Sequence, residues 1–367
     1  MDFLDGENTV EKMLIKHGVK DKRPVSGTLE LTPLCNMNCD ICYVHLSNEE
    51  MNKQGKILDI DKWLDLVDQL EKAGVLFIML TGGEPLLFPG FKELYLKLKR
   101  MGMVITVNTN GTLIDEKWAA FFGENKPRRI NITLYGNDEK TYRDLCHYPG
   151  GFEKTVRAIK LLKDHGVKVK MNGSVTKANF DQIDDMYRIA QELDVPLHMD
   201  TYMLPGLKDR FKAFEEQSRL SPEDVAQARI KVLKNELGDE VFLNYVDSML
   251  MKVKQQYNYG CGIECQAGNS SFMINWQGLM KPCVSLFTPA VDVFKTGFEN
   301  AWKQIVTESK ELKINEKCAQ CKLRPLCNTC VATANWETGS FTEIPEYCCK
   351  EAKEMLRLLL LEKNDNQ

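Results

Sequence analysis

The sequence predicts an α/β protein built on a parallel sheet and followed by a small cysteine-rich domain. Between residues 27 and 205, six apolar strand-like runs alternate with stretches of helical periodicity, and repeated strand–helix units imply parallel strands joined by right-handed crossovers. Nine of the 13 cysteines fall between Cys261 and Cys349, and such clustering indicates metal or cluster ligands. The alternation alone fits an open doubly wound sheet and a barrel equally well.

Composition places the chain among ordinary globular proteins. Hydrophobic residues make up 43% and charged residues 27% of its 367 residues, a length for which two domains are the default. A net charge of −4 gives no electrostatic reason to expect a nucleic-acid partner. The N-terminus lacks an apolar signal core and no apolar run approaches a membrane span, so we expect a cytoplasmic protein with no membrane partner. Thiols stay reduced there, so disulfides are not expected.

Periodicity and turn residues give the elements in order. Strands are expected near Thr28, Leu76, Met103, Arg129, Val167 and Pro196. Helices are expected over residues 58–73, 91–100, 115–122, 151–165, 180–193, 221–237 and 240–253. We divide the chain into an N-terminal extension (1–26), the strand–helix region (27–205), a helical linker (206–258), the cysteine-rich domain (259–350) and a C-terminal helix with a tail (351–367).

Three cysteines on the loop after the first strand form the central motif: Cys35, Cys39 and Cys42. Three thiolates can hold three corners of a cubane iron–sulfur cluster, whereas an electron-transfer cubane takes four cysteines. One iron would stay open to bind a ligand and react. A zinc loop and a purely structural cluster are the alternatives.

The spacing of these cysteines resembles the signature of the radical SAM superfamily. The resemblance implies a partial barrel of six strands and helices, of the TIM type. It also implies that S-adenosylmethionine (SAM) binds the open iron of a [4Fe–4S] cluster and is cleaved reductively to a 5′-deoxyadenosyl radical. In parallel α/β folds the site gathers at the carboxyl ends of the strands.

A second motif, Thr81-Gly82-Gly83-Glu84-Pro85, follows the second strand. Two glycines let the backbone approach a ligand closely, and proline stiffens the exit. A plain strand-to-helix turn would explain the motif as well. It resembles the family motif that receives the methionine ammonium of SAM, with Glu84 as the expected acceptor, assisted by backbone carbonyls.

Polar residues at later strand ends are the other expected SAM contacts. By the resemblance, Asn108 and Thr133 would contact the ribose and the methionine carboxylate, although ordinary turn chemistry also explains them. Asn172 and Ser174 share one face of the fifth strand and are within reach of SAM in the same way. A half-buried strand explains that alternation equally.

One position departs from the family. The residue before the third cluster cysteine is usually aromatic and stacks near adenine; here it is Ile41, and Tyr43 follows the cysteine and is counted with the SAM contacts. Near the sixth strand, His198, Asp200 and Tyr202 share a face. Any of them could supply an acid or a base, and solvated strand-end residues are the simpler explanation.

The cysteine-rich region resembles a SPASM domain, the extension that holds two auxiliary [4Fe–4S] clusters in many radical SAM enzymes. A short hairpin with Gly278 at its turn precedes Cys283. Carried over by position, the first auxiliary cluster would use Cys261, Cys265, Cys283 and Cys330, and the second would use Cys318, Cys321, Cys327 and Cys348. Cys349 is the alternative to Cys348, and the spacing before Cys330 is one residue shorter than in the family. Two zinc sites remain an alternative, because thiolates accept both metals.

The resemblance implies an oxidoreductase that modifies a peptide or protein. We expect three [4Fe–4S] clusters, SAM, and an external electron donor such as flavodoxin or ferredoxin. Enzymes of this type commonly form thioether or carbon–carbon crosslinks in ribosomally made peptides. The alternatives are an anaerobic sulfatase-maturing enzyme, a cofactor-pathway enzyme and a multi-cluster electron carrier. Val284 stands where the sulfatase-maturing family has an Asp, which disfavours the first of these.

Overall fold

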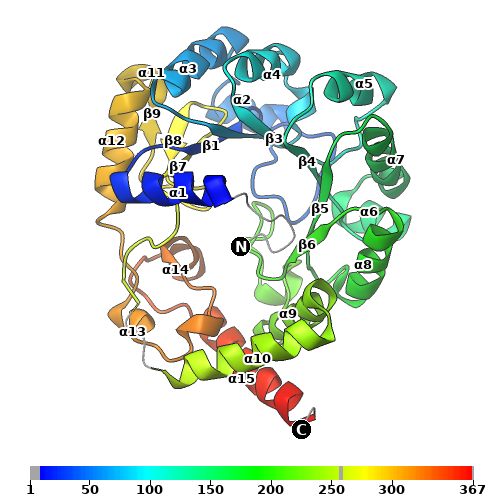
Figure 1. The fold of residues 1–367 in the computed structure, drawn as a ribbon, viewed down its shortest axis with the longest axis vertical. Coiled ribbons are helices and arrows are strands. Elements are labelled where there is room, and N and C mark those ends of the chain that lie inside the picture. The colour runs from blue at the N-terminus through cyan, green and yellow to red at the C-terminus, as the bar shows by residue number, and fades with distance from the viewer. Residues whose placement is uncertain (1–8, 256–258, 366–367) are drawn as a thin grey trace.

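The computed structural model describes residues 9–255 and 259–365. One sheet runs through the described chain in the order β6-β5-β4-β3-β2-β1-β7-β8-β9, curved so that helices cover its outer side (Figure 1). The strands are β1 (Ser26–Glu30), β2 (Phe77–Thr81), β3 (Val104–Thr109), β4 (Arg129–Thr133), β5 (Val169–Ser174), β6 (Leu197–Asp200), β7 (Ser271–Ile274), β8 (Leu279–Lys281) and β9 (Val291–Asp292). The first six are parallel to one another, which confirms the predicted strand–helix region as a partial barrel of the radical SAM type.

Helices follow most of the strands. They are α1 (Thr9–Asp21), α2 (Asn48–Gln54), α3 (Ile60–Lys72), α4 (Phe91–Arg100), α5 (Glu116–Glu124), α6 (Glu139–Cys146), α7 (Gly151–Asp164), α8 (Ile183–Glu192), α9 (Pro222–Leu237), α10 (Asp239–Lys254), α11 (Val293–Thr296), α12 (Phe298–Ser309), α13 (Glu316–Ala319), α14 (Val331–Thr338) and α15 (Glu346–Asp365). The helices expected from periodicity are all present. Periodicity missed α2, α6 and the four helices of the cysteine-rich region, α11 to α14, and α15 begins five residues before the predicted position 351.

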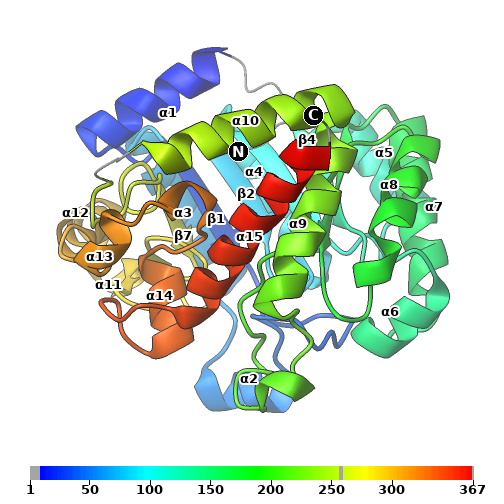
Figure 2. The ribbon, with the colours of Figure 1, turned by 90° about the horizontal axis from the view of Figure 1, so that it is seen from below.

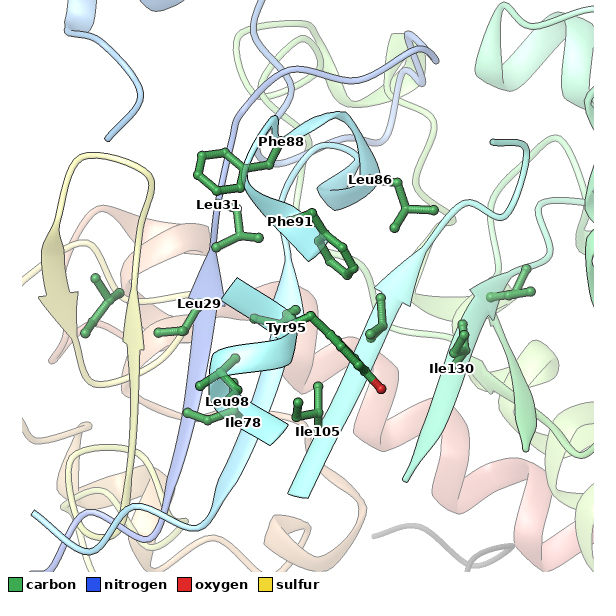
Figure 3. Close-up of a cluster of buried hydrophobic side chains, with 14 of the residues drawn as sticks. Leu29, Leu31, Ile78, Leu86, Phe88, Phe91, Tyr95, Leu98, Ile105 and Ile130 are labelled. Carbon is green, nitrogen blue, oxygen red and sulfur yellow. The ribbon is translucent and has the colours of Figure 1, made fainter. Parts of the chain in front are cut away.

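Apolar and polar residues alternate along the strands, so the two faces of the sheet differ in polarity. Leu29 and Leu31 point outward together with Ile78, and they pack against Phe91 and Tyr95 of α4 in a fully buried core (Figure 3). Burying one such large side chain contributes about 1.5–3 kcal/mol. The opposite face of the sheet carries mainly polar side chains. The barrel interior is thus lined by polar groups, which is unlike a core filled with apolar layers.

The cysteine-rich region is joined to the barrel through the sheet. Its first strand, β7, pairs in parallel with β1 and so covers an edge that would otherwise expose unpaired backbone groups. The predicted hairpin is β7–β8, with Gly278 at φ 84° in its turn. A Cβ on Gly27 of β1 would stand 2.4 Å from the Phe272 ring, so glycine is needed where the two parts meet. Sequence patterns gave no sign of this continuous sheet.

Three helices close the remaining side of the molecule. Figure 2 shows α15 lying across α9 and α10. Their contact is a second apolar core that includes Phe242, Met355 and Leu359. The predicted helical linker therefore packs as part of the C-terminal region. The predicted boundary between this linker and the cysteine-rich domain, at residues 258 and 259, borders residues 256–258, which lie outside the described residues. Residues 1–8 of the predicted N-terminal extension and 366–367 of the predicted tail also lie outside them. Within the described chain, no helix combines the length and apolarity needed to cross a membrane.

Candidate functional site

The three-cysteine loop lies at the carboxyl end of β1, and the Gly-Gly-Glu-Pro turn holds it there. Backbone N–H groups of Gly83 and Glu84 donate to the carbonyls of Thr32 and Leu34 at 2.7 and 2.8 Å. A Cβ on Gly83 would stand 2.4 Å from the Leu34 oxygen, and one on Gly82 would stand 2.6 Å from the Thr32 oxygen. The two glycines therefore allow a close approach to the chain's own backbone, immediately before Cys35.

Two of the three thiols of the loop have N–H donors beside them. Met37 N lies 3.4 Å and the Asn110 amide nitrogen 3.6 Å from Cys35 Sγ, and His45 N lies 3.2 Å from Cys42 Sγ. Hydrogen bonds to sulfur stabilise cluster thiolates and tune the potential of a cluster. This donor arrangement fits an iron–sulfur cluster.

The protonation of the thiols follows from their burial. Burial raises the pKa of Cys35 to about 12 and also raises the pKa of Cys42, and the neighbouring thiols add to both effects. A hydrogen bond from Cys146 lowers the pKa of Cys39. Two of the three thiols therefore keep their protons at neutral pH unless a metal replaces them, which is the usual linkage of metal binding to proton release.

A zinc ion and a cubane cluster require different arrangements of cysteine ligands. Over the part of the chain that the structure describes, no three His, Cys, Asp or Glu side chains converge as ligands of a single metal ion. A structural zinc needs four ligands at about 2.0–2.3 Å from one point. Cysteines of a cubane bind different irons and stand farther apart.

Glu84, the predicted acceptor for the SAM ammonium, is held by donors of the chain itself. Its side chain is fully buried, and its carboxylate accepts bonds from the Thr109 hydroxyl (2.8 and 2.9 Å), Asn110 N (2.9 Å) and Leu86 N (3.1 Å). Burial raises its pKa to about 7, although these donors oppose the shift. The carboxylate braces the ends of β2 and β3 through three donor groups, which occupy most of its roughly four acceptor positions.

The predicted SAM contacts on the strands divide into two groups. Thr133, Asn172 and His198 stand side by side on the inner face of β4, β5 and β6, and Ser174 lies one row farther along that face. Asn108 is already engaged, because its oxygen accepts from the Asn131 amide at 2.7 Å and its own amide lies 3.1 Å from Met79 Sδ. Its availability for the ribose is thereby reduced.

Two residues whose side chains contact the cysteine loop were not among the site residues predicted from the sequence. Asn110 donates to Asn36 Oδ1 at 2.9 Å as well as approaching Cys35. The buried Tyr135 hydroxyl is hydrogen-bonded to Cys39, and burial followed by the nearby thiols raises the pKa of Tyr135. Both follow the ends of predicted strands by one or two residues. Position at a strand end was the available signal, but it could not say which of the neighbouring polar residues turns toward the loop.

A segment between β6 and α9 straps the cysteine loop from the other side. Leu207 N donates to the Cys42 carbonyl at 2.8 Å, and Lys208 Nζ donates to the Asn38 carbonyl at 2.7 Å. A Cβ on Gly206 would stand 2.8 Å from the backbone of Asp40 and Ile41. The first part of the predicted helical linker is thus a nonhelical strap that belongs to the site.

The end of α6 completes the enclosure of the loop. Backbone N–H groups of Asn38 and Asp40 donate to the carbonyls of Cys146 and Leu145, each at 3.0 Å. His147 also lies 2.9 Å from the Asp40 carboxylate. Cys146 is fully buried beside Cys39, which agrees with its interpretation as a small packed residue and places it next to a cluster ligand.

The first auxiliary set gathers around the end of the β7–β8 hairpin. Burial raises the pKa of Cys283 to about 11, and the Cys330 and Cys265 thiols are near enough to add to the shift. Cys261 packs in the same small apolar cluster as Cys283. Thr333 N lies 3.4 Å from Cys330 Sγ. These contacts support the predicted set of four ligands, including Cys330 with its shortened spacing.

The second auxiliary set favours the alternative last ligand. Burial raises the pKa of Cys318, and the Cys349, Cys327 and Cys321 thiols add to it in that order. Cys348, the ligand preferred from spacing, is fully buried, and only Cys327 among the other cysteines contributes to its raised pKa. Cys349 thus interacts with Cys318, Cys321 and Cys327, which favours it as the fourth ligand.

The acid–base candidates near β6 are tied to the C-terminal region. His198 Nδ1 lies 2.8 Å from the Glu236 carboxylate of α9, and His198 Nε2 lies 3.7 Å from the Asp200 carboxylate. The Tyr202 hydroxyl donates to Glu337 of α14 at 2.5 Å. These partners make structural crosslinks between the barrel and the C-terminal helices.

Three comparisons with known proteins agree with this geometry. The model of the radical SAM superfamily matches residues 29–190. An AdoMet-dependent heme synthase from Methanosarcina barkeri is 24% identical over 344 residues, which cover 87% of this chain and 94% of that protein. A cysteine-type anaerobic sulfatase-maturating enzyme from Clostridium perfringens is 27% identical over 349 residues, covering 86% and 90%.

Among solved structures, Streptococcus suis SuiB bound to its precursor peptide SuiA superposes with a TM-score of 0.67 at 17% identity, covering 94% of this chain and 82% of SuiB. These relatives confirm the predicted resemblance to SPASM-type maturases. The residues matched by the superfamily model begin within β1 and include both the three-cysteine loop and the Gly-Gly-Glu-Pro turn. Residues 29–190 therefore match a radical SAM domain, and the chain as a whole is similar to enzymes that carry one.

Proposed function

We propose that this enzyme oxidatively modifies a peptide or protein, with SAM bound at the Cys35, Cys39 and Cys42 loop and two auxiliary [4Fe–4S] clusters in the C-terminal region. The observation that carries the proposal is the continuous sheet. Because β7 extends the barrel next to β1, Cys283 follows directly from a hairpin that is part of the same sheet as the SAM loop. An electron leaving the substrate would then have a close acceptor.

The residues of the chain have separate roles in this proposal. When bound, the cluster of the loop supplies the electron that cleaves SAM to methionine and a 5′-deoxyadenosyl radical, which removes a hydrogen atom from the substrate. Gly83 and Glu84 hold the loop against β2, and the strap at Gly206 holds it against the C-terminal region. Thr133 and Asn172 lie on the inner face, where polar groups suit the ribose and carboxylate of SAM.

A peptide substrate is supported by SuiB, whose solved structure holds a precursor peptide within the same fold. Thioether or carbon–carbon crosslinking is the reaction class that we propose. A tetrapyrrole substrate is the second candidate, because heme synthases are among the relatives. A sulfatase substrate is disfavoured by Val284, which offers no base beside Cys283.

The test uses the anaerobically reconstituted enzyme with SAM, a flavodoxin or ferredoxin reducing system, and each short peptide encoded beside its gene. The expected result is deoxyadenosine together with a peptide that has lost two hydrogens, detected by mass spectrometry. Cys283→Ala should raise the ratio of deoxyadenosine to modified peptide, because cleavage continues while the electron acceptor is damaged. An unchanged ratio would make that cluster a scaffold, and turnover of a porphyrin but of no peptide would replace the peptide proposal.

A further inference from the structure

A cavity of about 410 Å³ opens at the carboxyl ends of β1 and β7. Its lining includes Tyr43, the residue after the third loop cysteine, and Val284, the residue after Cys283. The cavity therefore lies between the proposed SAM cluster and the first auxiliary set. A larger cavity of about 710 Å³ lies around Lys22 and Arg23, before β1 begins, and is at the wrong end of the strands for this chemistry.

One cation in the wall of the smaller cavity lacks the partner that its burial requires. The Nε and Nη2 atoms of Arg210 are buried, and their N–H groups donate to no acceptor in the described chain. The guanidinium instead stands over aromatic rings, 4.8 Å from the centroid of Trp336 and 5.8 Å from those of Phe287 and Phe211. Aromatic contact supports a cation but leaves its N–H groups unsatisfied, and a buried donor without an acceptor is destabilising.

A second arginine shows what Arg210 is missing. Arg219 is also surrounded by aromatic rings, with Tyr347 at 4.0 Å, and its Nη2 is paired with the Glu337 carboxylate at 2.7 Å. Both arginines lie in the same connection between β6 and α9. Among the described residues, a carboxylate pairs with Arg219 and none pairs with Arg210, so the open partner position at Arg210 matches a carboxylate that arrives with a ligand.

The remaining charges of the cavity favour an anion. Lys281 Nζ stands 5.2 Å from the centroid of Phe287, and Lys281 lines the cavity together with Arg210. The acid in the wall is Glu30, which is 4% exposed. Two cations against one carboxylate give the lining a net positive charge. Its volume is at the small end of ligand pockets, which suits one or two side chains of a peptide better than a tetrapyrrole ring.

We propose that this cavity binds the substrate peptide and that Arg210 pairs with a carboxylate of that peptide, from an Asp or Glu side chain or from its C-terminus. The proposal rests on the proposed function and names its substrate class. Arg210 thereby fixes the peptide between the SAM loop and Cys283. The aromatic rings of Phe287 and Trp336, 5.0 Å apart, hold the guanidinium in place and pack against the peptide.

The experiment measures binding, so that it does not depend on turnover. The anoxic holoenzyme with SAM is titrated calorimetrically with three probes: acetyl-Gly-Gly-Glu-Gly-Gly-amide, the same peptide with Gln, and acetylated pentaglycine with a free C-terminal carboxylate. We expect one of the carboxylate probes to bind at least about tenfold more tightly than the Gln probe, a difference of about 1.4 kcal/mol. The probe that binds identifies the source of the carboxylate.

Variants of the enzyme then test whether Arg210 is the residue that binds the carboxylate of the probe. Arg210→Met should abolish the preference, Arg210→Lys should keep only part of it because lysine lacks the planar fork, and the exposed control Arg100→Met should leave it unchanged. Equal binding of all three probes by the wild type, or no binding, overturns the inference without the use of a variant. Deoxyadenosine formation and peptide modification are measured in parallel. If both persist in Arg210→Met, the inference fails and the proposed function stands.

Discussion

Replacing Glu84 with Gln distinguishes a bracing carboxylate from one that binds SAM directly. The carboxylate accepts two backbone N–H groups, one on each oxygen, from Leu86 and Asn110. The amide of Gln can accept on one side only, so its NH₂ group must face one of these donors, whichever way it turns. Leaving one buried donor unsatisfied costs about 1–3 kcal/mol. We therefore expect Glu84→Gln to lower the free energy of unfolding by about that amount.

The assay is thermal unfolding of the apoprotein and of the reconstituted enzyme, with SAM affinity measured alongside. A loss of 1 kcal/mol lowers the Tm of a large domain by about 2–4 °C. Both the Tm and the iron content should fall, because Asn110 also approaches Cys35 at 3.6 Å. Glu93→Gln, an exposed change on α4, is the matched control. A Glu84→Gln enzyme with wild-type Tm and iron content but weak SAM binding would refute the bracing role and restore a direct contact with the ammonium.

Three further changes test other parts of the structure. Cys349→Ala should remove about a third of the iron whereas Cys348→Ala should not, because the Cys349 thiol interacts with the other three; the opposite result would restore Cys348 as the ligand. Gly83→Ala should lose iron and SAM cleavage together, since its Cβ would meet the Leu34 oxygen at 2.4 Å; normal iron content would show that the backbone moves freely. Asp200 and Glu236 raise the pKa of His198 to about 9, so the charged imidazole stabilises the fold fully below about pH 6.5 and less as pH rises through 9. The difference in unfolding free energy between wild type and His198→Gln should therefore shrink over that range from about 1–3 kcal/mol, and a difference that is independent of pH would contradict the shift.

The parts of the fold that the sequence predicted are those set by local periodicity. Each strand from β1 to β6 begins within two residues of its predicted start, because apolar runs and turn residues mark it directly. The pairing of β7 with β1 could not be foreseen. It joins residues about 245 positions apart, and its only local trace is a glycine at 27 opposite Phe272.

Within the site, spacing identified the cysteines but not the directions of side chains. Asn108 and Asn110 are both polar residues at one strand end, yet the first turns to Asn131 and the second to the cysteine loop. Likewise Cys348 and Cys349 are adjacent in sequence, and the rotation of α15 decides which one interacts with the other thiols. Such choices depend on tertiary packing, which no periodicity encodes.

The central claim is that three cysteines hold a SAM-cleaving cluster apart from two auxiliary clusters. The most direct measurement is iron content and deoxyadenosine formation in wild type and in the triple variant Cys35→Ala, Cys39→Ala and Cys42→Ala, after anaerobic reconstitution. Three cubanes predict about 12 irons per wild-type chain. The triple variant should keep about two-thirds of the iron, retain its fold, and form no deoxyadenosine from SAM under reducing conditions. Deoxyadenosine formation at the wild-type rate in that variant would contradict the account.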